Sequence, residues 1–171
     1  MRVWKFLLPG LAAMLLLAGC ASYHLGAVNG QVAGGQSIEI QPFNNQTMQP
    51  RLGDAVTQAL RERVQSDGTC RLATSAPGDV VVSGVLREYH RVGMSFLNHD
   101  VATPQDFRVT LTAHVTVRSR ATGKVLLERD VLGHTLINLG ADMASSERQA
   151  APLLAADLAQ NIVSLITEGE W

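Results

Sequence analysis

The sequence predicts an α+β fold, a two-layer sandwich with an antiparallel sheet of four to five strands covered on one face by two amphipathic helices. Three successive stretches between residues 79 and 135 alternate apolar and polar side chains, as half-buried strands do. Two longer stretches repeat apolar residues at three- and four-residue spacing, which predicts helices. A length of 171 residues with 46% hydrophobic residues suits one packed domain with a short extension.

The expected elements follow a regular order along the chain. They are strand 37–43, polar turn 44–47, helix 51–65, short edge strand 70–73, strand 79–91, loop 93–105, strand 107–118, strand 124–135, loop 136–143 and helix 145–168. Helix 51–65 carries a stripe of apolar residues, and Gly68 just beyond it is a stop signal. These elements predict a single domain over residues 37–171.

The three central strands are predicted from their alternation. In 79–91 the pattern places Val80, Val82, Gly84 and Leu86 on one face, and Val81, Val85 and Tyr89 on the other. Strand 107–118 has the strictest alternation, and the turn at 121–123 makes it a hairpin with 124–135. In the last helix, Pro152 is expected either to lie in the first turn or to kink the helix.

The first twenty residues differ in kind from this domain. A basic start is followed by an uncharged apolar run, Phe6 to Ala18, which is short for a permanent span of about 20 residues. The run ends in Leu-Ala-Gly-Cys20, which resembles the lipobox of bacterial lipoproteins. The resemblance implies a lipoprotein signal peptide over 1–19 and acylation of Cys20; an ordinary signal peptide or a buried helix is the alternative. By resemblance to the sorting of Gram-negative lipoproteins, Ala21 in place of Asp favours the outer membrane over retention at the inner one.

Cleavage before Cys20 would change the composition that matters. It removes Arg2 and Lys5, leaving 12 basic against 15 acidic side chains and a net charge of −3. Such a balance gives no indication of nucleic-acid binding. Residues 20–36 are expected to form a lipidated tether, and Cys70, the remaining thiol, is expected to be buried because a periplasm is oxidising.

Motifs that carry chemistry are hard to find in this chain. No two of its five histidines have the spacing of a helical zinc site, and no nucleophile elbow or phosphate-binding loop is present. His114 falls on the polar face of strand 107–118, where we expect a solvated or hydrogen-bonded side chain. The sequence therefore predicts no catalytic residue, metal site or cofactor.

Basic residues gather on the predicted hairpin. Arg118 and Arg120 precede its turn, Lys124 follows it, and Arg108 shares the polar face of the strand with Arg118. Arginine forks suit two-point contacts with phosphate or carboxylate, so these four residues are candidate ligand- or partner-binding residues. Composition alone favours the simpler interpretation of a solvated turn.

With this organisation in place, the chain resembles the LptE family, the lipoproteins of lipopolysaccharide assembly. The resemblance covers nearly all of the chain after Cys20. The residues that carry it are Tyr23-His24-Leu25, Ile38-Glu39-Ile40, Phe43-Asn44-Asn45-Gln46-Thr47, Pro50, Leu52, Thr57, Ala59, Leu60, Gly78-Asp79-Val80, Gly84, Phe107-Arg108-Val109, Thr122-Gly123, Glu147, Ala150 and Asp157-Leu158-Ala159.

The resemblance implies a non-enzymatic protein held by acyl chains on the periplasmic face of the outer membrane. Its domain would plug the lumen of the β-barrel translocon LptD, help that barrel to assemble, and contact lipopolysaccharide during delivery to the outer leaflet. Under this interpretation Arg118, Arg120 and Lys124 would meet lipid A phosphates or acidic barrel residues. The alternatives are an accessory lipoprotein of another envelope complex, such as a secretin, and a periplasmic enzyme with a dispersed site.

Overall fold

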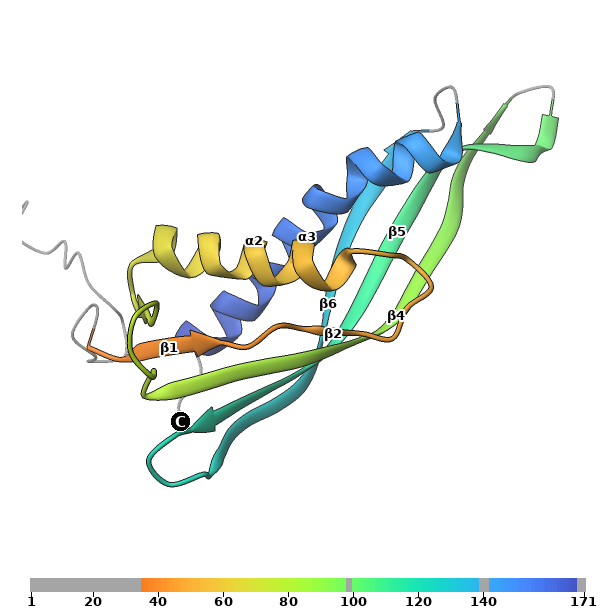
Figure 1. Cartoon of the computed structure of the whole chain (residues 1–171). Helices are drawn as coiled ribbons and strands as arrows, with labels where there is room; N and C mark the ends of the chain where they lie inside the picture. The colour runs from red at the N-terminus through yellow and green to blue at the C-terminus, as the bar shows by residue number, and fades with distance from the viewer. Residues whose placement is uncertain (1–34, 98–99, 139–141, 169–171) are drawn as a thin grey trace, which may run out of the picture.

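Two helices pack on the same face of a six-stranded sheet in the computed structural model of the chain, which describes residues 35–97, 100–138 and 142–168 (Figure 1). The strands are β1 (Ser37–Ile40), β2 (Asn44–Asn45), β3 (Arg71–Leu72), β4 (Val80–Leu97), β5 (Asp100–Ser119) and β6 (Val125–Asn138). The helices are α2 (Leu52–Asp67) and α3 (Met143–Glu168). The expected two-layer arrangement, with both helices on one face, is confirmed.

The core lies between these helices and the central strand β5. Alternate β5 side chains are completely buried, as its strict alternation predicts: Val109, Leu111, Ala113, Val115 and Val117. Val56 and Leu60 of α2 and Leu158 and Ile162 of α3 pack against the same face and are also fully buried. One contiguous apolar cluster therefore joins the sheet to both helices.

The prediction of a purely antiparallel sheet of four to five strands is wrong, because the sheet is mixed and has six strands. Its order is β3-β1-β4-β5-β6, with β2 pairing separately on β4. β1 pairs in parallel with both β3 and β4, and β2 also runs parallel to β4. Parallel neighbours need a long crossover, and α2 supplies it between β1 and the later strands. Only β4, β5 and β6 form the expected antiparallel meander.

The prediction of a loop over 93–105 is also wrong. β4 continues to Leu97 and β5 begins at Asp100, so the two strands form one long antiparallel ribbon. The register shifts repeatedly between Gly93 and Leu97. Glycine and proline are tolerated in strands at such bulges, which is why Gly93 and Pro104 do not end the strands.

A bulge between Leu86 and Glu88 changes which way the rest of β4 faces. Leu86 pairs with Ala113, and after the bulge Tyr89 pairs with Leu111. Because Ala113 and Leu111 are both on the buried face of β5, Tyr89 also faces the helices and packs against the core. The prediction that Tyr89 lies on the face opposite Leu86 is therefore wrong.

The C-terminal end of α2 matches its sequence signal. Gly68 follows the helix with φ of 74°, and its N–H donates to the carbonyl of Val64 at 3.3 Å, which confirms it as the stop.

Of the expected turn at 44–47, the first two residues form β2, and the chain turns after them. The Asn45 side chain holds this turn, accepting from the backbone N–H of Thr47 at 3.0 Å and donating to the Gln49 carbonyl at 2.7 Å.

Pro152 lies inside α3, about ten residues from its start, rather than in the first turn. Within the described residues, α3 is the one helix long and apolar enough to cross a membrane by length and composition alone. Its apolar side is buried against the sheet and α2, as in a core helix of a globular domain. The loop expected over 136–143 is shorter, since β6 reaches Asn138 and α3 begins at Met143.

Candidate interaction surface

The sheet face that the helices leave uncovered, called the open face below, carries two of the candidate residues, Arg108 and Arg118. Its central row comes from β5 and alternates with the buried row: Arg108, Thr110, Thr112, His114, Thr116 and Arg118. β4 and β6 flank this row on both sides, so side chains from three strands stand next to one another.

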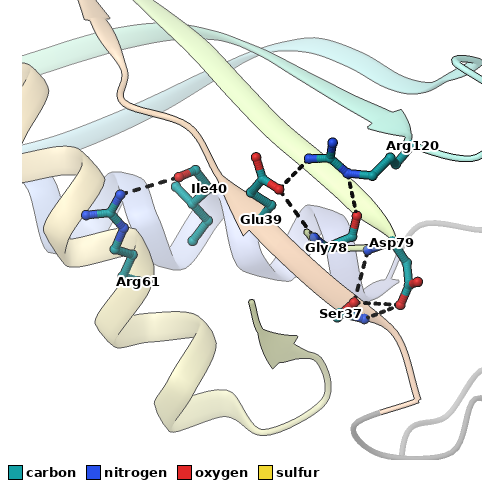
Figure 2. Close-up of polar contacts among 7 residues, drawn as sticks. All are labelled: Ser37, Glu39, Ile40, Arg61, Gly78, Asp79 and Arg120. Carbon is teal, nitrogen blue, oxygen red and sulfur yellow. Dashed lines mark hydrogen bonds and ion pairs between the residues drawn. The ribbon is translucent and has the colours of Figure 1, made fainter. Parts of the chain in front are cut away.

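Arg120 is occupied by structural contacts and does not project freely from the hairpin (Figure 2). Its Nε donates to the carbonyl of Gly78 at 2.9 Å, and its Nη2 forms an ion pair with Glu39 on β1. Glu39 also accepts from the backbone N–H of Gly78 at 3.3 Å. Arg120 therefore fastens the end of the β5–β6 hairpin to β1 and to the turn before β4.

The same end of the sheet is closed by a second polar contact, between Ser37 and Asp79 (Figure 2). The Asp79 carboxylate accepts from the Ser37 hydroxyl at 2.6 Å and from the Ser37 backbone N–H at 3.0 Å. The backbone N–H of Asp79 donates in return to the Ser37 hydroxyl at 3.0 Å. These hydrogen bonds hold the pKa of Asp79 below its ordinary value.

Arg118 and Lys124, the other two hairpin cations, are held by fewer structural contacts than Arg120. Arg118 donates from Nη1 to the Gly123 carbonyl across its own turn at 3.1 Å and remains exposed. Lys124 is exposed, and no ion pair joins it to another described residue. Arg118 and Lys124 are thus the two predicted hairpin residues that can meet an external anion.

Arg108 lies far from this hairpin. Ten residues of β5 separate it from Arg118, which corresponds to about 33 Å along an extended strand. It pairs with Val92 on one side and Leu136 on the other, and both of these side chains are exposed. The four predicted cations therefore do not form one cluster.

His114 stands near the middle of the open face between two carboxylates of β6. Its Nδ1 is 2.7 Å from Asp130 Oδ1, and its Nε2 is 3.0 Å from Glu128 Oε1. Arg87 of β4 reaches the same oxygen of Asp130 from the other side at 3.4 Å. The hydrogen bonds to Glu128 and then Asp130 raise the pKa of His114. The expectation of a hydrogen-bonded side chain is confirmed.

On the opposite face, a pocket of about 250 Å³ opens beside the first turns of α3. Its walls are mainly apolar and include Leu52, Val109, Ala150 and Leu154. Tyr89 and Glu147 supply polar groups to the pocket. The Tyr89 hydroxyl donates to Glu147 at 3.3 Å, and Arg91 pairs with the same carboxylate at 2.7 Å. Burial, followed by the charge of Glu147, raises the pKa of Tyr89 to about 12. Sequence reasoning missed this pocket because the β4 bulge that turns Tyr89 inward has no signature in the alternation.

The described residues contain no group of three or more His, Cys, Asp or Glu side chains placed to hold a metal ion. Cys70 is buried, as expected for a lone thiol, and burial raises its pKa and makes it less reactive. Cys20, the predicted lipidation residue, lies outside the described residues, as do the signal peptide and most of the tether.

A mixed sheet with two helices on one face and an open face on the other defines a small two-layer α+β domain. The family model for lipopolysaccharide assembly, LptE, matches residues 35–166. The chain belongs to the LptE family, as the resemblance of its motifs indicated. Membership supports a non-enzymatic outer-membrane lipoprotein associated with the lipopolysaccharide transport machinery.

Solved structures share the fold at low sequence identity. A hypothetical protein of Chlamydia trachomatis is 12% identical, with a TM-score of 0.56 over 77% of this chain and 95% of that one. A Xanthomonas campestris protein is 14% identical, with a TM-score of 0.55 over 82% and 89%. A minor lipoprotein of Acinetobacter baumannii is 14% identical, with a TM-score of 0.51 over 78% and 93%. No curated protein matches the chain.

Proposed function

We propose that the chain plugs the lumen of an LptD-type β-barrel, helps that barrel to assemble and assists the transport of lipopolysaccharide to the outer leaflet. Acyl chains on Cys20 would anchor it to the periplasmic face of the outer membrane, where several chains hold far more firmly than one. The observation that carries the proposal is the family match over residues 35–166, which spans all six strands and nearly all of both helices.

The open face supports this proposal physically. Among the described residues, no helix or loop covers it, and its rows mix polar, charged and apolar side chains from three strands. A face of this kind can bind the wall of a polar barrel lumen without exposing a continuous apolar surface before assembly. The helix side, in contrast, is occupied by the core of the domain itself.

Barrel assembly gives a direct test of the proposal. An LptD-type barrel is produced with and without the lipidated chain, and the amount that resists unfolding by detergent before heating is measured. We expect the folded fraction to fall several-fold without the chain. An equal amount of folded barrel in both cases would contradict the assembly role, and rescue by an unrelated lipoprotein would show that any lipoprotein suffices.

The hairpin cations are assigned to contact with lipid A phosphates or acidic barrel residues. Because Arg120 is held by Glu39 and Gly78, a sharper test reverses Arg118 and Lys124 only and keeps Arg120. Arg118→Glu with Lys124→Glu should weaken lipopolysaccharide binding, and low salt should enlarge the difference.

A matched control makes this test specific. Arg129→Glu with Arg51→Glu changes the total charge equally. Arg51 is exposed just before α2, and Arg129 pairs with the buried residue Val115, so both changes leave the open face untouched. Binding by the control should stay unchanged. Equal binding by wild type and by the Arg118/Lys124 variant would show that the hairpin is only a solvated turn.

A further inference from the structure

The half of the open face farthest from the hairpin carries three exposed apolar side chains among its polar and charged ones. Val92 of β4 is 58% exposed, and Leu132 and Leu136 of β6 are 55% and 63% exposed. The strand register places Arg108 between Val92 and Leu136 in a single row. The distal patch is defined here as these four residues together with Thr110 and Thr112, which lie between them on β5.

Most charged side chains of the open face have partners within it. Near its middle, His114, Glu128, Asp130 and Arg87 are joined to one another by hydrogen bonds and ion pairs. In the distal half, Glu88 Oε2 lies 3.4 Å from His90 Nε2, and the Asp106 carboxylate accepts from Ser95 and Asn138. In the distal patch, Arg108 forms no ion pair or side-chain hydrogen bond with any other described residue. An exposed guanidinium flanked by apolar side chains is suited to a carboxylate that arrives with apolar neighbours of its own.

The shape of the patch indicates what kind of partner it can take. Its residues come from three adjacent strands, which lie about 5 Å apart and form a broad surface. Acyl chains need a concave site that surrounds them, and the apolar pocket beside α3 is on the other side of the sheet. A broad surface on which exposed apolar residues flank an unpaired guanidinium is typical of a protein–protein contact.

We propose that the distal patch is the surface through which the domain binds its partner protein, with Arg108 paired to a partner carboxylate. This inference rests on the proposed function, under which the partner surface is the wall of the barrel lumen. Val92, Leu132 and Leu136 then lose their exposure to water on binding. The hairpin at the opposite end of β5 is not part of this patch.

The test is co-purification of the barrel with the full-length lipidated chain. Arg108→Glu should lower the amount of barrel recovered per chain by about tenfold, since a buried charge pair is replaced by two like charges. Val92→Ser with Leu136→Ser should lower it several-fold. The matched controls are Arg129→Glu, which faces away from the open face, and Leu153→Ser, which is 62% exposed on α3; both should recover barrel as wild type does. Equal urea midpoints would show that every variant is folded.

The outcomes separate the two proposals. Loss of the barrel in the patch variants, with wild type and controls unchanged, supports the distal patch. Full recovery of the barrel by Arg108→Glu overturns the patch and leaves the proposed function standing. If the patch variants retain the barrel but lose bound lipopolysaccharide, the patch is also overturned as a protein contact, in favour of a lipid contact. A wild-type chain that recovers no barrel overturns both.

Discussion

The carboxylate of Asp157 on α3 accepts a hydrogen bond from the backbone N–H of His134 on β6 at 2.8 Å. One turn further along α3, Asn161 donates to the backbone carbonyl of Leu132 at 2.8 Å. β6 is an edge strand, so these two groups would otherwise face water. Gly133 lets the helix approach, because a Cβ there would lie 2.6 Å from Cβ of Leu158. Side chains of α3 thus take the place of a missing neighbouring strand and protect this edge from pairing with other chains.

Removing this edge cap should destabilise the domain. Asp157→Ala leaves the His134 N–H without its charged acceptor, and we expect the free energy of unfolding to fall by about 1–2 kcal/mol. Urea denaturation measures the change. Asp157→Asn keeps an acceptor oxygen and should cost less. A change equal in both variants would show that the hydrogen bond is not the cause.

Phe43 packs directly over Gly84 of β4, and a Cβ at that position would overlap Cε1 of the ring. Gly84→Ala should therefore lower the free energy of unfolding by about 1–3 kcal/mol through overpacking. Phe43→Leu in the same chain should relieve part of this loss, because the smaller side chain makes room. A double-mutant cycle measures the coupling, and strictly additive effects would contradict the contact.

Titration of His114 should make the stability of the domain depend on pH. Its folded-state pKa is raised above 6.5, so the stabilising contribution is complete below that value and is lost as the pH rises through the folded-state pKa. The difference in unfolding free energy between wild type and His114→Gln should shrink over that interval. NMR of the imidazole ring measures the pKa directly, and a midpoint at or below 6.5 would contradict the two hydrogen bonds.

Arg120 and Lys124 are only a few residues apart, but they should respond differently to truncation. Arg120→Ala breaks the contacts to Gly78 and Glu39, and we expect a loss of about 1 kcal/mol, limited by the partial exposure of the pair. Lys124→Ala should change the free energy of unfolding by less than about 0.5 kcal/mol. Equal effects in thermal or urea unfolding would show that the Arg120 contacts contribute no stability.

Local patterns predicted much of this fold. The alternation of β5, the apolar stripes of both helices and the stop at Gly68 all have physical causes that act within one element. The parallel pairing of β1 did not follow from sequence, because strand direction depends on how α2 crosses over the sheet. The bulge after Leu86 was also missed, since one extra residue changes the facing of Tyr89 without changing residue types.

The candidate surface was predicted only in part. Exposure of Arg108 and Arg118 follows from their position in an alternating strand. The ion pair between Arg120 and Glu39 could not be predicted, because it depends on the mixed sheet, which brings β1 beside the turn before β4. Val92 and Leu136 were not placed on the sheet, because the predicted strand ended at 91 and residues 136–143 were expected to form a loop, whereas β4 and β6 continue past both positions. Their place beside Arg108 is set by register across three strands.

The most direct test of the central claim is affinity purification of the tagged, lipidated chain from detergent-solubilised outer membranes, with mass spectrometry of its partners. The account predicts a large LptD-type β-barrel in one-to-one ratio with the chain. Recovery of the chain alone, or with a secretin in place of that barrel, would contradict the plug function and leave the LptE fold as described.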